Sequence, residues 1–177
     1  MAAAETQLQL QIIREVRDAL TAAGVGWWLF GGWAMDFHAG RITRDHSDIE
    51  IFVRRDDIRR AREALVVRGF AAPPGLYPEE AQPFLKGGQE IGLWFIVTDG
   101  DGRTFTPGRW AEWPWPAGSF DGPHARLGEL EAPVMSLEGL LEMKLGFAAQ
   151  PHGAPLREKD IADIALLRAM IEGRANA

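Results

Sequence analysis

The chain has 177 residues, of which 46% are hydrophobic and 25% are charged, and its formal net charge is -6. This length and composition are typical of one globular domain with its own hydrophobic core, so we predict a single domain over residues 1–177. The absence of cysteine excludes disulfides, thiol catalysis and cysteine-based zinc sites, and the acidic balance argues against a protein that grips long nucleic acids through their phosphates.

The N-terminal segment predicts a helix followed by a strand. Apolar residues recur near helical spacing from residue 6 to residue 23, and Gly24 follows as a stop signal. Residues 27–30, with the sequence WWLF, form a short apolar run that is typical of a buried strand.

A glycine pair, a short helix and a second strand come next. Gly31 and Gly32 predict a turn, residues 33–39 predict a short helix, and Gly40 ends that helix. Residues 47–53 (SDIEIFV) alternate carboxylates with apolar side chains, which is the period of a half-buried strand. The local order is therefore strand, glycine turn, helix, polar loop and strand.

Asp48 and Glu50 are candidate metal ligands on this second strand. Side chains at positions i and i+2 of a strand point to the same face, roughly 6 to 7 Å apart, so one divalent cation could sit between them. Mg²⁺ prefers hard oxygen ligands, typically one or two carboxylates with substrate phosphates and water. The glycine turn and the N-terminus of the helix after it could hold phosphate oxygens. Taken separately, each feature also has a structural interpretation, as a solvent-facing acidic pair and as a simple turn.

The middle of the chain predicts one helix and a pair of strands. Residues 54–68 predict a helix whose arginines form either a phosphate patch or a solvated face paired with nearby acids. Residues 71–88 hold four prolines and three glycines and predict a loop. Residues 90–97 predict a strong strand, and a turn at residues 98–103 leads to a partner strand at residues 104–106.

The C-terminal half begins with a segment rich in Pro, Gly and Trp, residues 107–135. This segment either lines a substrate pocket or packs as an ordered loop over the edge of the sheet. Helices are predicted over residues 136–147 and 157–172. The single domain is thus divided into a core of residues 1–106, the segment 107–135, and C-terminal helices within residues 136–177.

Three further groups are predicted from their positions on helices. Lys144 either reaches a phosphate from a C-terminal helix or is a surface lysine. Asp36 is predicted to make a structural hydrogen bond to the loop at residues 40–43. Asp160 and Asp163 are predicted to pair with basic residues of their own helix or with the helices of the N-terminal part.

Two blocks of the chain carry a resemblance to a known family. They read Gly31-Gly32-Trp33-Ala34-Met35-Asp36 and Gly40-Arg41-Ile42-Thr43-Arg44-Asp45-His46-Ser47-Asp48-Ile49-Glu50. This resembles the polymerase-beta type of the nucleotidyltransferase superfamily, closest to the small bacterial aminoglycoside and lincosamide nucleotidyltransferases. Their pattern is roughly Gly-Gly-Trp-Ala-x-Asp, then Gly-Arg-x-Thr-Arg-x-His-x-Asp-Ile-Asp. A weaker similarity covers residues 137–144 and 157–163, which look like the closing helices of that family.

The resemblance implies a fold and a set of roles. The fold would be α+β, a nucleotidyltransferase fold with a small mixed β-sheet flanked by helices and with C-terminal helices closing the domain. Gly31 and Gly32 would hold the triphosphate of a nucleotide, Asp48 and Glu50 would bind Mg²⁺, and Arg44 would contact a phosphate.

One part of the chain departs from the family pattern. A third carboxylate, the candidate general base, comes in the family from a later strand that reads Val-Asp-Leu-His or similar. The matching segment here is Ile91-Gly92-Leu93-Trp94, so Gly92 stands in the expected place of an acid. Glu90 points to the same face of that strand, where it either supplies the missing carboxylate or is an exposed residue at the start of the strand.

The function expected from these features is Mg²⁺-dependent transfer of a nucleoside monophosphate. The donor would be ATP or another nucleoside triphosphate, and the acceptor would be a hydroxyl of a small molecule, for example an aminoglycoside- or lincosamide-like antibiotic. Aminoglycosides are polycations that need an acidic pocket, and six acidic residues could furnish one: Glu79, Glu80, Asp99, Asp101, Glu112 and Asp121. The alternative is a catalytically weakened relative that binds a nucleotide or a partner without turnover.

The partners and compartment are expected to be those of a soluble enzyme. No apolar run approaches the ~20 residues of a membrane helix, and residues 1–5 carry no signal-peptide features, so we expect a cytoplasmic protein without a membrane role. A nucleic-acid-modifying enzyme is disfavoured by the acidic balance. The sequence gives no indication of the oligomeric state.

Overall fold

The computed structural model describes residues 2–75, 77–122 and 124–175. Leu76 and Pro123, which fall in segments predicted as loops, lie outside the described residues. Met1 and residues 176–177, which the single-domain prediction includes, also lie outside them.

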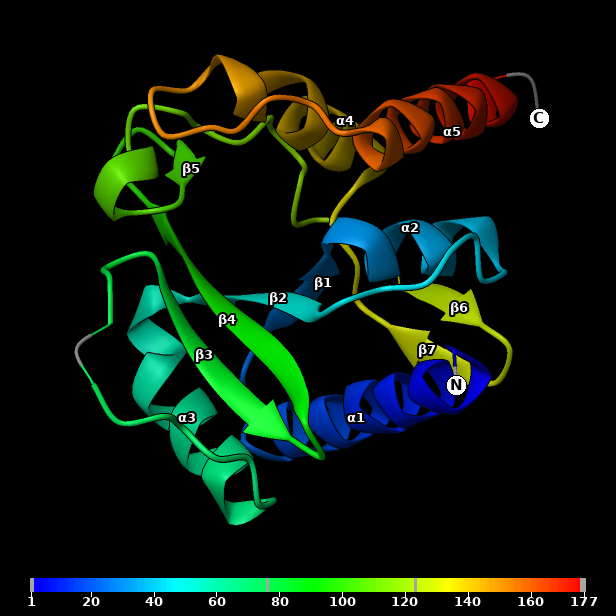
Figure 1. Cartoon of the computed structure of the whole chain (residues 1–177). Coiled ribbons are helices and arrows are strands. Elements are labelled where there is room, and N and C mark those ends of the chain that lie inside the picture. Colours follow the sequence, from blue (N-terminus) through cyan, green and yellow to red (C-terminus); the bar gives the residue numbers. More distant parts are fainter. Residues whose placement is uncertain (1, 76, 123, 176–177) are drawn as a thin grey trace.

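Helices and strands alternate in the N-terminal part, and helices alone end the chain (Figure 1). The elements are α1 (Ala2–Ala22), β1 (Trp27–Phe30), α2 (Gly31–Ala39), β2 (Ile49–Arg54), α3 (Ile58–Val67), β3 (Ala81–Lys86), β4 (Gln89–Thr98), β5 (Thr104–Phe105), β6 (Ala125–Leu127), β7 (Leu130–Ala132), α4 (Leu137–Gly146) and α5 (Glu158–Ala175). Short 3-10 turns lie at Arg55–Asp57, Gly108–Trp110 and Phe147–Ala149. The α+β class predicted from the sequence is confirmed.

The main sheet is mixed and has the strand order β1-β2-β4-β3, with β5 pairing to β4. The strands β2 and β4 are parallel, whereas β1 and β3 are antiparallel to their neighbours. Figure 1 shows α4 and α5 together at one end of the molecule, α1 and α3 together at the other end, and the sheet with α2 between them. The site described below lies where the sheet meets the C-terminal helices.

The strand β2 contributes to the core through apolar side chains at every second position. Ile49, Ile51 and Val53 are fully buried, as the predicted alternation requires. On the opposite face of β2, which carries Glu50, the next side chain along the strand is Phe52, and it is only 1% exposed. Aromatic side chains therefore share that face of the sheet with Glu50.

Two predictions of irregular structure were wrong in part. Residues 81–86, predicted as loop, form β3, which pairs antiparallel with β4. Its Pro83 is tolerated because β3 lies at the edge of the sheet, where a missing N–H need not break a ladder bond. Residues 125–132, within the Pro-, Gly- and Trp-rich segment, form the hairpin β6–β7, whose three-residue strands are too short to leave a periodic signal.

The remaining elements follow the predicted order. The helix α2 begins at Gly31, two residues earlier than predicted, so the glycine pair opens the helix and does not precede it. The segment just before α4 runs along β1, with hydrogen bonds of 2.8 Å from Leu29 N to Pro133 O and from Met135 N to Leu29 O. In the part of the chain that the structure describes, no helix is both long enough and apolar enough to cross a membrane.

Candidate active site

The two predicted metal ligands lie at the start of β2. Asp48 is exposed and directly precedes the strand, and Glu50, the second residue of the strand, is partly buried. Burial, followed by the negative charge of Asp48, raises the pKa of Glu50 to about 7. The two carboxylates are thus close enough to repel each other, and a divalent cation bound between them would relieve that repulsion. This donor set fits Mg²⁺.

Three cations from the C-terminal part of the chain act on Glu50 from the other side. Lys144 of α4, Lys159 of α5 and Arg157, which precedes α5, each favour the charged form of Glu50 and so oppose the rise of its pKa. Arg157 also interacts with Asp48, although the hydrogen bond to Asp160 is the largest cause of its own raised pKa. The pair of carboxylates therefore faces a basic wall.

A cavity of about 570 Å³ lies beside Glu50 and two of these cations, Lys144 and Arg157. Its polar lining comes from Glu50, Lys144, Arg157 and Asp160. Its other lining residues are Met143, Phe147, Ala154, Pro155 and Leu156. A polyanion that enters this cavity would be attracted by the cations of the basic wall. A metal ion bound to the carboxylates would offset the negative charge of those carboxylates.

Gly31 is required by the position of Glu50. Its φ of +66° is in the left-handed region that favours glycine. A Cβ atom at this position would also collide with Oε2 of Glu50. The first residue of α2 therefore brings the amide end of that helix against the carboxylate.

Gly32 is required by two side chains of the loop before β2. A Cβ atom at this position would collide with the ring of His46 and would lie 2.7 Å from Nη2 of Arg44. The guanidinium of Arg44 thus lies against the first turn of α2, and the glycine pair, Arg44 and Glu50 are close together.

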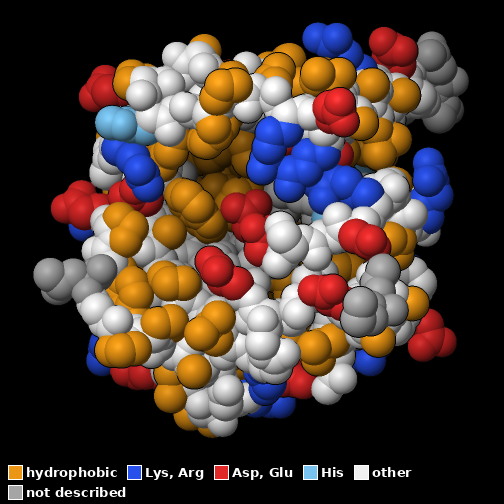
Figure 2. Space-filling view, in the orientation of Figure 1, with side chains coloured by type: hydrophobic (Ala, Val, Ile, Leu, Met, Phe, Trp, Pro, Cys, Tyr) orange, Lys and Arg blue, Asp and Glu red, His pale blue; other side chains and the backbone are white. Residues whose placement is uncertain are grey.

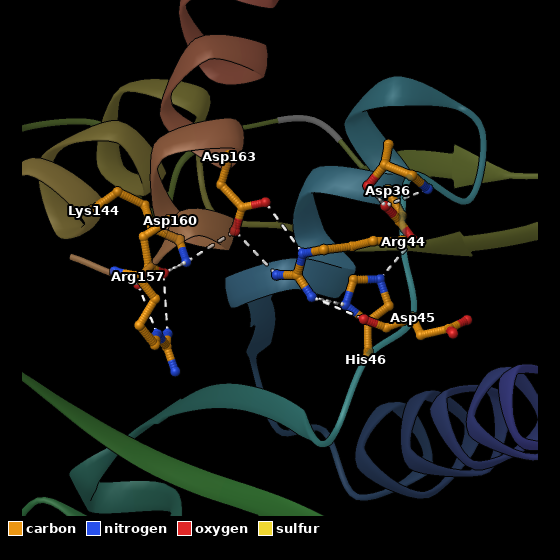
Figure 3. A network of polar contacts seen from close by, with 9 residues as sticks. Asp36, Arg44, Asp45, His46, Lys144, Arg157, Asp160 and Asp163 are labelled. Carbon is orange, nitrogen blue, oxygen red and sulfur yellow. Dashed lines mark hydrogen bonds and ion pairs between the residues drawn. The ribbon is translucent and has the colours of Figure 1, made fainter. Parts of the chain in front are cut away.

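Arg44 is held in place by a network of polar contacts (Figure 3). Its Nε and Nη2 atoms donate to Asp163 of α5 at 3.2 and 3.0 Å. Its Nη1 atom lies 3.0 Å from Nδ1 of His46, and the other nitrogen of that ring lies 2.7 Å from Oδ2 of the fully buried Asp36. Asp36 also accepts a 3.0 Å hydrogen bond from the amide of Thr43, so its predicted bond to the 40–43 loop is confirmed.

The same network continues through Lys144 to the start of α5. Nζ of Lys144 lies 2.8 Å from Asp160 and 3.0 Å from Asp163, and the lysine side chain is only 11% exposed. The interpretation of Lys144 as a surface lysine was therefore wrong. Asp160 binds Arg157 through two further hydrogen bonds of 2.7 and 3.0 Å, and these hold the pKa of Asp160 well below its ordinary value.

Gly92 lies directly beside Glu50 in the parallel register of β2 and β4. The space that a side chain would fill there is taken by Trp94, because a Cβ atom on Gly92 would lie 2.9 Å from the indole nitrogen. Glu90 is exposed near the start of β4, one residue before the pair Ile91–Ile49. The indole ring of Trp94 thus occupies the space beside Gly92, the position at which the family pattern has its third carboxylate.

Three carboxylates do not converge within the described residues. There, no group of three or more His, Asp or Glu side chains is placed to hold a metal ion. Asp48 and Glu50 are brought together, whereas Glu90 does not complete a three-carboxylate cluster with them.

A second cavity, of about 300 Å³, also opens on Glu50. Aromatic rings dominate its lining: Phe30, Phe52, Trp94, Trp110, Trp113, Trp115 and Phe147. The segment 107–135 contributes three of these tryptophans, so it lines a cavity beside Glu50, and it also pairs with β5 at the edge of the sheet. The strand periodicity that identified Glu50 could also have found Phe52, which is two residues further along the same face.

The six acidic residues considered as an acceptor pocket do not gather there. Glu80 is buried and pairs with Arg109 at 2.6 Å, and Asp99 pairs with Arg103. Asp101 and Asp121 line a separate cavity beside the 102–104 turn. None of the six lines either of the two cavities that open on Glu50.

A comparison with protein families gives one match over most of the chain. The family model described as aminoglycoside-2''-adenylyltransferase matches residues 12–167. Two curated relatives, the 2''-aminoglycoside nucleotidyltransferases of Klebsiella pneumoniae and Escherichia coli, are each 37% identical over 43 residues. That segment is 24% of this chain and 24% of each relative, so the matched part spans about a quarter of the curated proteins.

Solved structures share the fold at low sequence identity. The crystal structure of ANT(2'')-Ia in complex with adenylyl-2''-tobramycin has a TM-score of 0.76 and 16% identity, covering 95% of this chain and 92% of that one. The lincomycin-bound lincosamide antibiotic adenylyltransferase LnuA has a TM-score of 0.67 and 20% identity, covering 89% of this chain and 95% of that one. The chain therefore has the nucleotidyltransferase fold.

Proposed function

The chain belongs to the aminoglycoside-2''-adenylyltransferase family, and from this premise we propose that it transfers a nucleoside monophosphate to a hydroxyl of a small molecule. The donor is ATP or another nucleoside triphosphate, and pyrophosphate is the leaving group. The observation that carries the proposal is Glu50, which lies close to Asp48 and lines a cavity together with the cations Lys144 and Arg157.

Asp48 and Glu50 would hold Mg²⁺. Burial and, after it, the negative charge of Asp48 raise the pKa of Glu50, and a divalent cation bound at the pair would offset both effects. When bound, the cation would offset the charge of the triphosphate and of the displaced pyrophosphate.

The triphosphate would lie between the start of α2 and the C-terminal helices. The proximity of Gly31 and Gly32 to the acidic pair and to Arg44 supports a role for the amides of α2, because a helix N-terminus favours phosphate oxygens. Lys144 supplies positive charge from α4. The ion pairs of Arg44 and Lys144 with Asp163 fix both cations in position before the substrate arrives.

Glu90 would accept the proton of the attacking hydroxyl. It is exposed, and it shares a face of β4 with Gly92, the neighbour of Glu50 in the sheet. A carboxylate here has the chemistry of a general base, and solvent access lets it release the proton afterwards.

The test of this assignment is the variant Asp48→Asn. We expect Mg²⁺-dependent binding of ATP, measured by calorimetry, to weaken by at least about tenfold, because one of two charged metal ligands is lost. The matched control is Asp45→Asn, which removes an exposed carboxylate three residues earlier in the same loop and should leave binding within twofold. Unchanged affinity in Asp48→Asn would show that the metal site is wrongly placed.

The second candidate function is binding of a nucleotide or a partner without turnover. It is favoured by Gly92, where the indole of Trp94 fills the place of the family's third acid. Release of pyrophosphate from ATP that depends on one hydroxyl compound would exclude it. Mg²⁺-dependent ATP binding with no pyrophosphate release across a broad panel of hydroxyl compounds would favour it.

A further inference from the structure

The aromatic cavity beside Glu50 is built on one face of the sheet. In the register of the strands, Phe30 pairs with Glu50, and Phe52 pairs with Trp94. Cross-strand partners project to the same face, so Phe30 lies beside Glu50 in one row, Phe52 and Trp94 form the next row, and these rings make the floor. Figure 2 shows the result as a hollow lined by hydrophobic side chains, with acidic groups at its edge and a cluster of basic groups beside it.

The cavity walls are ordered by ring packing. Phe30 stacks on Phe52 with centroids 4.0 Å apart, and Phe52 meets Trp115 edge to face at 5.5 Å. Trp113 packs 5.5 Å from Trp115, and its indole N–H donates to Glu142 at 3.2 Å. A pre-formed aromatic wall favours a ligand with a ring or another flat apolar face.

The charge of the cavity disfavours a polycation. Glu50 is the one carboxylate among the lining residues, all of which the structure describes. A bound Mg²⁺ would neutralise this carboxylate. The guanidinium of Arg109 also lines the cavity and is paired with Glu80 outside it. Each ammonium group of a polyamine would lose water here without gaining an anionic partner, and that loss is costly in a largely apolar site.

The position of the cavity indicates which substrate it takes. The aromatic cavity and the basic cavity share Glu50, Met143 and Phe147 as lining residues. The attacking and leaving oxygens are roughly in line in transfer at phosphorus, so they lie on opposite sides of the phosphorus atom. Pyrophosphate, a polyanion, suits the basic side, and the hydroxyl compound therefore enters from the aromatic side.

We propose that the acceptor is a hydroxyl compound with a ring or apolar face and at most one positive charge, bound in the aromatic cavity with its hydroxyl at Glu50. This proposal rests on the nucleotidyl transfer proposed above. The acceptor oxygen forms a bond to the α-phosphorus, the bond from that phosphorus to the bridging oxygen breaks, and pyrophosphate leaves with the electron pair. The hydroxyl proton passes to Glu90 or to water.

Binding and turnover are measured with three acceptors of increasing charge: an uncharged phenyl glucoside, lincomycin with one amine, and the polyamine tobramycin. Binding is followed by tryptophan fluorescence with Mg²⁺ and a non-transferable ATP analogue, and turnover by pyrophosphate release from ATP. We expect phenyl glucoside or lincomycin to bind at least about tenfold more tightly than tobramycin. Preference for tobramycin, or no binding of the other two, would overturn the proposal.

A pair of tryptophan variants locates the acceptor. Trp94→Leu removes a ring of the cavity and should raise the dissociation constant and KM of the preferred acceptor by about tenfold, with the KM for ATP unchanged. The control is Trp28→Leu, which changes a ring in the same row of the sheet that does not line this cavity. If Trp94→Leu raises the KM for ATP instead, the cavity holds the nucleobase and the proposal is wrong.

The acceptor panel also separates this proposal from the proposed transfer activity. If the uncharged ligand binds as predicted while no acceptor releases pyrophosphate, the ligand class stands and the proposed transfer activity fails.

Discussion

Two sets of influences act in opposite directions on the pKa of Glu50, one local and one from the C-terminal part of the chain. Burial and Asp48 raise its pKa, while Lys144, Lys159 and Arg157 act in the opposite direction, and the result is a pKa of about 7. A carboxyl group in this state is poised to lose its proton when a cation binds.

The raised pKa of Glu50 predicts a pH-dependent stability of the metal-free protein. Because its folded-state pKa lies above the unfolded value of 4.5, the protonated group favours folding, and this contribution is lost as pH rises toward 7. Replacing Glu50 by Gln removes the cost of charging the group. The free energy of unfolding is measured by urea denaturation in the presence of EDTA. The difference between Glu50→Gln and the wild type should be roughly 2 kcal/mol more in favour of the variant at pH 8 than at pH 5. Parallel pH profiles for the two proteins would contradict the assigned environment.

At the scale of elements, a chain of ion pairs joins the loop before β2 to α4 and α5. Asp163 is its centre, since it binds both Arg44 and Lys144 at 3.0 Å while its own side chain is 5% exposed. Burial opposes its charge, yet hydrogen bonds from Arg44 and Lys144 lower its pKa. The C-terminal helices are thus tied to the loop that carries Asp48.

Removing Asp163 should destabilise the fold far more than removing a surface partner. Asp163→Ala leaves two largely buried cations without this carboxylate, and we expect a loss of about 2 to 4 kcal/mol in the free energy of unfolding from urea titrations. The matched control is Glu131→Ala in the pair Arg126–Glu131, whose side chains are 68% and 44% exposed, and it should cost below about 1 kcal/mol. Equal losses in both variants would mean that the network does not stabilise the closing helices.

At the scale of the whole molecule, the candidate site is assembled from the N-terminal half of the chain and from its C-terminal helices. The carboxylates come from the region of β2, and the cations come from α4 and the start of α5. Ligand binding at such a site is coupled to global unfolding, because the unfolded chain does not hold these groups together.

Mg²⁺ and ATP together should therefore raise the melting temperature of the protein. At a ligand concentration about 100-fold above Kd the expected stabilisation is about 2.7 kcal/mol. For a domain of this size that corresponds to a shift of roughly 5 to 10 °C, measurable by differential scanning fluorimetry. Asp48→Asn should lose the Mg²⁺-dependent part of the shift. A full shift in that variant would place the metal elsewhere.

The sequence by itself determined the features that depend on local order. The alternation of β2, the glycine pair and the helical repeats of α1 and α5 follow from the spacing of neighbouring residues, and they located Asp48, Glu50 and most elements. The edge strand β3 was missed because Pro83 is a local signal against a strand, and only pairing with β4 overrides it.

Only the tertiary structure decided which distant side chains share a site. Arg44 and Asp163 are 119 residues apart, and no local pattern indicates that they pair. The aromatic cavity collects rings from β1, β2, β4, the segment 107–135 and the turn after α4. Such contacts depend on how the elements pack and on which buried charges must be neutralised. Local sequence patterns are therefore sufficient to identify the two candidate metal-binding carboxylates. The basic cavity and the aromatic cavity beside Glu50 arise only from the packing of segments that are far apart in sequence.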